Sequence, residues 1–492
     1  MKKVLSLVAL SVLAGCGGSE GGSAPPPPAP KYTFNFIQQY SVGQSEVKPE
    51  CAVFGLDTTQ TVPEQHVIAA RELDLIEGLS VLALDSSGEL IRSYKVPKGG
   101  ELSIDQSDIP QNGYVAFVES ILSYVSGKGD VFVQVIHKDF IQDAYFNVVK
   151  EQSVESECYK DTSALTREVN RLVNMSAVDL GEVPDKYIAT TITDSSISNI
   201  STDIAITTPE NRAVLGKGTK DGQLLGYVFI PFSELTDPDS ATSNIARLRR
   251  DVNDVPWQIV DTSVFTDAEI NVKYANHFYN WQLMDKVSGV YAYPSTNDSG
   301  ISSSHWYVWA NGTTLNNWTV EQNEKIDSPS LGYDLTFALQ QEPLDRQPTV
   351  NRNCSQSVTN TCVDLNGAMG ATPTEQGYNI QRSFVKAKLG QSDVWMSVYA
   401  PPTDNQIIPS TGDAEFDKAF SLGTIERQDV TLAQYDRNKI YHFMASFSDP
   451  ESVTNNDHTQ TYTDSKYLIR LPSDVINDEN DLLSTERTVV RR

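Results

Sequence analysis

The chain is poor in positive charge, cysteine and histidine. Its 492 residues include five cysteines, six histidines and six methionines, and 38 Lys and Arg stand against 64 Asp and Glu. The formal net charge is therefore −26. A chain this acidic repels phosphate groups, which excludes nucleic acid as a partner and argues against direct binding to anionic lipid.

Recognisable signatures of catalysis and metal binding are missing as well. Beyond residue 30 the chain contains no G-x-S-x-G, no H-E-x-x-H and no Walker-type loop. Gly216–Gly222 (GKGTKDG) lacks the phosphate-loop spacing and is interpreted as a turn. The acidic stretches Asp237–Asp239 and Asn477–Leu483 do not follow the calcium-loop pattern. We therefore expect no catalytic residue, no metal and no cofactor, and keep an unrecognised hydrolase as an alternative because carboxylates can converge from distant positions.

A leader-like apolar run occurs only at the N-terminus. Lys2 and Lys3 precede the apolar run Val4–Ala14, a pattern typical of a secretory signal and too short to span a bilayer. Cys16 follows, and then Gly17–Pro30, which is rich in Gly, Ser and Pro. Such a tract stays extended and flexible, so it is interpreted as a tether that spans roughly 30–40 Å.

The end of this leader resembles a known sorting signal. Leu13-Ala14-Gly15-Cys16 is similar to the lipobox of bacterial lipoproteins. The resemblance implies that residues 1–15 are removed and that Cys16 receives a diacylglycerol and a further acyl chain such as palmitate. Several acyl chains on one cysteine would anchor the chain stably. In that family an aspartate after the cysteine favours the inner membrane, so Gly17 implies the outer membrane.

Two other interpretations accompany this resemblance. In the first, the leader is an ordinary cleaved secretory signal, and Cys16 lies near its end without being lipidated. In size, acidity and missing catalytic motifs, the chain also resembles lipoproteins of sheathed flagella, although no internal motif carries that likeness.

The remaining cysteines predict disulfides. An even number in an exported chain indicates disulfides rather than free thiols. Of the three possible pairings, proximity in the sequence favours Cys51–Cys158 together with Cys354–Cys362. A zinc site is the alternative, but the spacing is not that of paired CxxC motifs and no histidine is in register.

Short apolar runs bounded by Gly, Pro, Asp, Asn and Ser recur along the chain, which predicts strands and turns. We expect a mainly β fold with two or three antiparallel β-sandwich-like domains and a short connecting helix. The helix is expected because Leu165, Val169 and Leu172 have helical spacing. The expected divisions after the tether (16–30) are a β-sandwich over 31–160, a helical connector over 161–185, and β-rich domains over 186–340 and 341–492.

Tryptophans gather in one part of the sequence. A strand through "HWYVWA" would place Trp306 and Trp309 on opposite faces, and Trp281 and Trp318 lie nearby. Since both faces of such a strand would be apolar, we expect it to be covered on both sides. The alternative is a sugar-binding platform in which Trp306, Trp309 and Trp318 stack on glycan rings.

These features predict an outer-membrane-anchored lipoprotein with a structural, adhesion or binding role at the cell envelope, and no enzymatic activity. Its expected partners are the membrane, through the lipid anchor, and envelope proteins, filament proteins or glycans. Nucleic acid is not expected. The alternatives are a glycan-binding surface lipoprotein and an unrecognised hydrolase.

Overall fold

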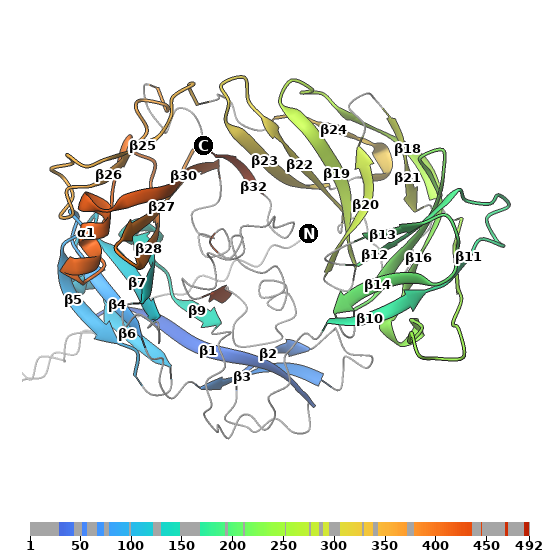
Figure 1. Cartoon of the computed structure of the whole chain (residues 1–492), viewed down its shortest axis with the longest axis horizontal. Coiled ribbons are helices and arrows are strands. Elements are labelled where there is room, and N and C mark those ends of the chain that lie inside the picture. The colour runs from blue at the N-terminus through green and yellow to red at the C-terminus, as the bar shows by residue number, and fades with distance from the viewer. Residues whose placement is uncertain are drawn as a thin grey trace, which may run out of the picture.

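The fold is mainly β, as the sequence predicts, with several antiparallel sheets (Figure 1). One α-helix, α1 (Ala414–Leu422), is among the described elements. The computed structural model describes residues 29–491 apart from 44–51, 57–65, 73–77, 98–99, 122–128, 148–167, 192–194, 210–211, 251, 275–276, 285–288, 295–305, 327–328, 338–342, 371–377, 435–443, 445–467 and 471–486.

The largest element is a sheet of twelve strands that curves as an arc from β5 to β20 (Figure 1). Its strands are short and rich in β-branched and aromatic residues, which suits a pleated surface that is buried on at least one side. In spatial order the strands are β20 (His277–Met284), β19 (Phe265–Tyr274), β22 (Trp306–Thr313), β23 (Thr319–Ile326), β32 (Arg487–Arg491), β30 (Thr424–Gln434), β27 (Ile380–Leu389), β28 (Ser392–Ala400), β8 (Asp130–His137), β7 (Tyr114–Ile121), β4 (Leu79–Leu84) and β5 (Leu90–Lys95).

Two long-range pairings hold this sheet together. Strand β8 pairs in parallel with β28, from Val131↔Val394 to Ile136↔Tyr399. Strand β32 lies between β23 and β30 and is antiparallel to both. The sheet thus takes strands from all three expected β regions, so the borders expected near 160 and 340 do not coincide with borders of the sheet.

A second sheet contains the first strand of the chain. Its central strand is β1 (Lys31–Gly43), which begins at the residue after the proline-rich tract. In spatial order the strands are β2 (Ala52–Leu56), β3 (His66–Glu72), β1, β9 (Ala144–Asn147) and β31 (Leu468–Arg470), and β6 (Glu101–Asp105) also pairs with β1.

A four-stranded sheet stands next to the β20 end of the arc (Figure 1). Its order is β13 (Ser195–Ser198), β12 (Lys186–Thr190), β15 (Val214–Lys220) and β16 (Gln223–Ile230). Most of the GKGTKDG segment is therefore strand, and only Asp221–Gly222 forms a turn, where both residues have positive φ. The turn interpretation of the whole segment was wrong because glycines that fit a turn also permit close packing of a strand.

The smaller sheets complete the described fold. They are β10 (Glu168–Val173) with β14 (Ile204–Pro209); β11 (Met175–Ser176) with β17 (Ala246–Arg247); β21 (Gly289–Pro294), β18 (Val252–Ile259) and β24 (Tyr333–Leu335); and β25 (Thr349–Asn351), β26 (Cys362–Asp364) and β29 (Asn405–Ile407).

The helical connector expected over 161–185 is wrong where the structure describes it. Glu168–Val173 form strand β10, which pairs with β14 from Glu168↔Pro209 to Val173↔Ile204. Val169 and Val173 are β-branched, and the pairing supplies their main-chain hydrogen bonds, so tertiary context overrides the helical spacing. Among the described residues no helix is long and apolar enough to cross a membrane.

Candidate functional site

The tether attachment, defined as Pro30–Phe36, is where the proline-rich tract meets the folded body. The main-chain N–H of Gln106 donates a hydrogen bond to the carbonyl oxygen of Pro30 (2.9 Å). The main-chain N–H of Thr33 donates to Oδ1 of Asp143 (2.7 Å). The last residue of the tract is thus already bound to the fold, and no free linker separates the tract from β1.

Strand β1 is hydrogen-bonded on both sides within this attachment. It pairs antiparallel with β6 from Lys31↔Asp105 to Asn35↔Glu101. It also pairs in parallel with β9, beginning at Phe34↔Ala144. A pull on the N-terminal end of β1 would run along this strand and would be shared by main-chain hydrogen bonds to both neighbours.

Four phenylalanines fix the attachment to the interior. Phe34 and Phe36 alternate with polar residues on β1 and point to the core with Phe117 of β7 and Phe146 of β9, and all four are completely buried. The rings of Phe36 and Phe146 stack with centroids 4.9 Å apart, and those of Phe34 and Phe117 meet edge to face at 5.2 Å. Phe117 and Phe146 contact each other at 4.5 Å. Such aromatic contacts add to the burial energy of each ring.

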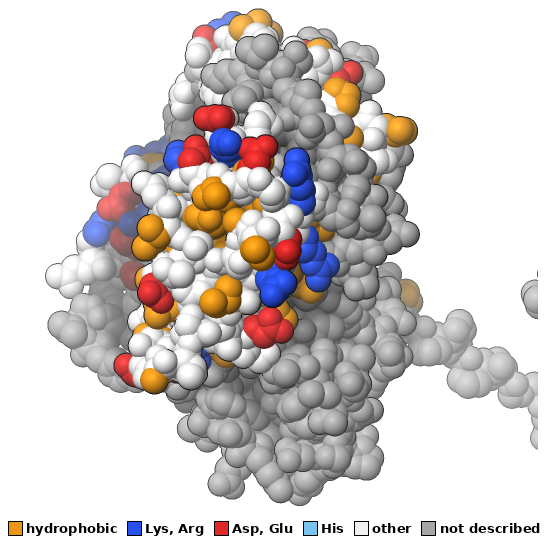
Figure 2. All heavy atoms as spheres, turned by 90° about the vertical axis from the view of Figure 1, so that its right-hand side faces the viewer, with side chains coloured by type: hydrophobic (Ala, Val, Ile, Leu, Met, Phe, Trp, Pro, Cys, Tyr) orange, Lys and Arg blue, Asp and Glu red, His pale blue; other side chains and the backbone are white. Residues whose placement is uncertain are grey.

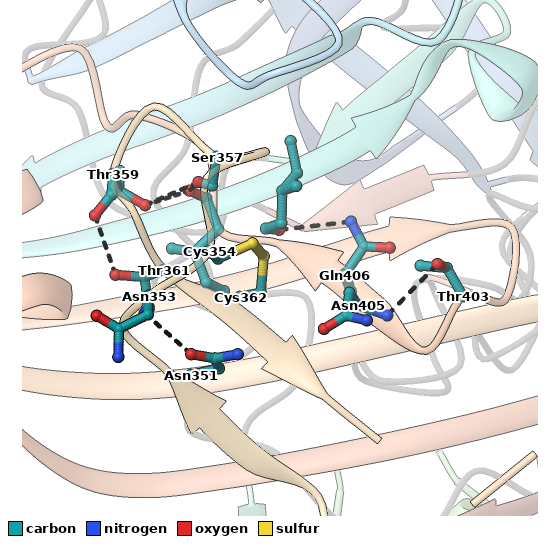
Figure 3. The surroundings of a disulfide bond; sticks show 12 residues. Asn351, Asn353, Cys354, Ser357, Thr359, Thr361, Cys362, Thr403, Asn405 and Gln406 are labelled. Carbon is teal, nitrogen blue, oxygen red and sulfur yellow. Dashed lines mark hydrogen bonds between the residues drawn. A yellow bond between two sulfur atoms is a disulfide. The ribbon is translucent and has the colours of Figure 1, made fainter. Parts of the chain in front are cut away.

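Lipidation of Cys16 stays a prediction, because that residue lies outside the described part of the chain. The predicted partners Cys51 and Cys158 also lie outside it. The shorter predicted disulfide is present: Cys354 and Cys362 are bonded, with their Cα atoms 5.7 Å apart (Figure 3).

The disulfide closes a small loop against β29, the strand that pairs with β26 (Figure 3). Inside the loop, the hydroxyls of Ser357 and Thr359 both donate to the carbonyl oxygen of Ile408 (2.7 and 2.6 Å). Both cysteines are buried. The bond therefore stabilises a packed loop that already has internal hydrogen bonds.

Replacing both Cys354 and Cys362 with serine is expected to lower the free energy of unfolding by about 2–3 kcal/mol, because the unfolded chain would gain the entropy of a short open loop. Urea unfolding measures the change. The wild-type protein under reducing conditions should match the double variant, and Gln356→Ala in the same loop should behave as wild type because that side chain is exposed. Equal stability of the double variant and the oxidised wild type would contradict this expectation.

The tryptophans divide between the two faces of the sheet. Trp306 and Trp318 are buried, at 1% and 0% exposure, and belong to the main core together with Trp281. Their rings therefore present no surface on which a sugar could stack. Trp309 faces the other way and is half-buried, and its Nε1 is enclosed without a hydrogen-bond partner.

A charged network crosses the middle of the long sheet. Lys386 Nζ lies 3.1 Å from Asp393 and 2.7 Å from Glu426, and it stands 4.2 Å from the ring centroid of Trp395. The hydrogen bond to Glu426 is the main cause that raises the pKa of Lys386. Trp395 in turn stacks on Phe132 of β8 at 6.0 Å. The network ties three neighbouring strands to β8 across the parallel pairing.

The acidic stretches show no metal-binding cluster where they are described. Asp237 Oδ1 accepts a hydrogen bond from the main-chain N–H of Asp239 (3.0 Å), and its other oxygen lies 3.6 Å from Arg171. This carboxylate thus stabilises a turn and pairs with a cation. Asn477–Leu483 lie outside the described residues, and within those described no group of three His, Cys, Asp or Glu could hold a metal ion.

One face of the molecule exposes apolar side chains. Figure 2 shows the side that carries the four-stranded sheet, with apolar side chains in its middle and charged ones along its upper and right-hand borders. Between residues 168 and 250, the segment that contains the four-stranded sheet, the exposed large apolar residues are Val178, Val183, Ile197, Ile200 and Ile245. An apolar centre with a charged rim is typical of faces that contact other proteins.

The sequence interpretation missed which residues complete the tether attachment. Phe34 and Phe36 alternate with polar residues, which is typical of a strand with one buried face, and Phe117 and Phe146 lie in short apolar runs that are typical of strands. Nothing in the sequence indicated that β1, β7 and β9 share one core, because residues so far apart are brought together only by the fold.

Comparisons with known proteins do not place the chain in a family. No family model matches it. No curated protein matches it either. A solved structure described as "Ca2+-stabilized adhesin helps an Antarctic bacterium reach out and bind ice" is 9% identical over 82% of this chain and 95% of that chain, with a TM-score of 0.12. Another, described as "Structural insight into host cell surface retention of a 1.5-MDa bacterial ice-binding adhesin", is 7% identical over 63% of this chain and 99% of that chain, with a TM-score of 0.10. TM-scores this low do not show a shared fold.

Proposed function

We propose that this chain is a lipoprotein anchored in the outer membrane through Cys16, with a structural or adhesive role at the cell envelope. The observation that carries the proposal is the continuity between tether and fold. The tract that follows the lipobox ends at Pro30, and β1 begins at Lys31. A force between the membrane and the folded body would therefore pass directly into a strand that is paired on both sides.

The rest of the fold suits a body that resists such a force. The twelve-stranded sheet joins early and late parts of the chain, and a buried aromatic cluster fixes β1 to β7 and β9. The exposed apolar face in Figure 2 offers a surface for contacts with envelope or filament proteins. Glycan binding is a weaker alternative, since two of its three proposed tryptophans are buried.

Substitution of the anchoring cysteine tests the proposal. Wild-type protein should sediment with the outer membrane, whereas Cys16→Ser should be recovered in the soluble fraction, because acyl chains supply the membrane affinity. Cells should be fractionated and each fraction probed with an antibody against the folded body. Gly17→Ser is the matched control, because it introduces the same residue at the next position and keeps Cys16. This variant should show the wild-type distribution between the membrane and soluble fractions.

The adhesive form of this role requires the protein to lie on the cell surface, which needs a second measurement. Protease added to intact cells should remove wild-type protein, or the protein should travel with isolated filaments. The same distribution of wild type and Cys16→Ser would contradict the lipid anchor. Full protection of the wild type in intact cells, together with its absence from filaments, would contradict the role at the cell surface.

A further inference from the structure

A lysine is enclosed where the four-stranded sheet meets the end of the long sheet. Lys217 on β15 is 4% exposed. The glycines on either side of it let neighbouring chains approach closely: a Cβ at Gly216 would lie 2.6 Å from Met175 Sδ, and one at Gly218 would lie 2.7 Å from Pro184. These contacts lie on the opposite face of β15 from Lys217, because side chains alternate along a strand, so both faces of β15 are packed here.

The aromatic side chains of this junction exclude water from the lysine. Tyr227 of β16 packs on Trp281 of β20 with ring centroids 5.0 Å apart, and Phe229 stacks on Tyr274 at 3.8 Å. The hydroxyl of Tyr279 donates to the carbonyl oxygen of Ala213 (2.9 Å), close to the start of β15. The four-stranded sheet and the β20 end of the twelve-stranded sheet are thus packed against each other around Lys217.

The Lys217 amine is held against β20 by neutral groups. Its Nζ donates to the main-chain oxygens of Asn280 (2.8 Å) and Trp281 (3.0 Å). Burial lowers the pKa of Lys217 to about 8, and the charge of Glu269 opposes that change only in part. At pH 7 roughly one tenth of the Lys217 side chains therefore carry the neutral, nucleophilic amine, far more than for an exposed lysine.

A carboxamide and a carboxyl group complete the arrangement. Asn280, whose main-chain oxygen accepts from Lys217, donates through its side-chain Nδ2 to Oε2 of Glu269. The other oxygen of Glu269 accepts from Nδ2 of Asn271 (3.1 Å). Asn271 lies opposite Asn280 across the β19–β20 pair. Lys217, Asn280 and Glu269 therefore belong to one chain of contacts: the amine is bonded to the main-chain oxygen of Asn280, and the side-chain amide of Asn280 is bonded to Glu269.

We propose that Lys217 and Asn280 form an intramolecular amide bond, with Glu269 as the proton-transfer group. The neutral Nζ attacks Cγ of Asn280, and Glu269 takes a proton from Nζ as the new bond forms. Glu269 then gives a proton to Nδ2 as the Cγ–Nδ2 bond breaks, and ammonia leaves. No electron is gained or lost, and Glu269 returns to its starting state.

The new bond would join the four-stranded sheet covalently to β20. In the twelve-stranded sheet β20 is the outermost strand next to β19. The hydrogen bonds of Lys217 to β20 would be supplemented by a bond that denaturant cannot break. This modification does not depend on the lipid anchor, so the two proposals are tested by separate measurements.

Peptide mapping of the full-length protein purified from cells tests the bond. Trypsin does not cleave after an acylated lysine, so residues 213–220 should remain whole and joined to the tryptic peptide 274–286, which contains Asn280. The joined species should be lighter than the sum of the two peptides by one ammonia. Glu269→Gln should reduce it by about 10-fold or more, because a carboxamide does not transfer protons as a carboxyl does.

The chain supplies its own control lysine. Lys386 is also largely shielded, but its ammonium is paired with Asp393 and Glu426 and it should be cleaved normally. Complete cleavage after Lys217 in the wild type would overturn the proposal. Linkage of 213–220 to the peptide 251–273, which contains Asn271, would overturn the assignment to Asn280.

Discussion

Replacing Trp306 with alanine is expected to lower the free energy of unfolding by about 3–5 kcal/mol. The Trp306 side chain is 1% exposed and meets Trp281 edge to face, with ring centroids 5.1 Å apart. The substitution removes a large apolar surface from the main core and leaves a cavity among neighbours that cannot fully collapse. Urea unfolding followed by circular dichroism measures the loss.

An exposed apolar residue of the neighbouring turn provides the matched control. Leu315 is 76% exposed, so Leu315→Ala should change stability by about 0.5 kcal/mol or less. If Trp306→Ala were as stable as wild type but bound polysaccharide less well, the core assignment would be wrong and the sugar-binding platform would be supported. Binding is followed by the intrinsic tryptophan fluorescence of both proteins.

Replacing Phe117 with alanine should have an effect of similar size, about 3–5 kcal/mol, on the part of the fold that contains the N-terminal half of β1. Phe117 contacts Phe34 and Phe146 and lies 6.4 Å from Phe36, measured between ring centroids. Its removal takes away edge-to-face and tilted contacts as well as buried area. Loss of these contacts should release β1 before the rest of the protein unfolds.

Hydrogen exchange measured by mass spectrometry separates local from global loss. In Phe117→Ala, amides of 31–36 should exchange faster than in wild type, and amides of β27 and β28 should change less. Ile91→Ala on β5 is the control, because that side chain is 50% exposed and should leave both regions unchanged. Uniformly faster exchange throughout the sheet would contradict a local role of the phenylalanine cluster.

Local patterns in the sequence predicted individual strands well and one helix badly. Phe34 and Phe36 alternate with polar residues along β1, and the turn-forming residues Asp85–Gly88 lie between the paired strands β4 and β5. There Oδ1 of Asp85 accepts hydrogen bonds from the main-chain N–H of Ser87 and Glu89, a purely local device. The region around Val169 carried the spacing of a helix, yet its pairing with β14 made it a strand.

The candidate sites differ in how far the sequence could predict them. A disulfide between Cys354 and Cys362 follows from their short separation. The side chains around Lys217 could not be predicted, because Glu269 and Asn280 come from another sheet. Their chemistry depends on burial, which has no signature in the residues next to the lysine.

The sequence by itself determined the composition limits, the mainly β character and the shorter disulfide, and it predicts the leader with its cysteine and tether. These properties depend on residue type and on neighbours a few positions away. Only the tertiary structure decided that β8 pairs with β28, that β32 lies between β23 and β30, and that Trp306 belongs to the core. Main-chain hydrogen bonds are the same for every residue, so the partner of a strand is selected by the packing of whole faces rather than by its own residues.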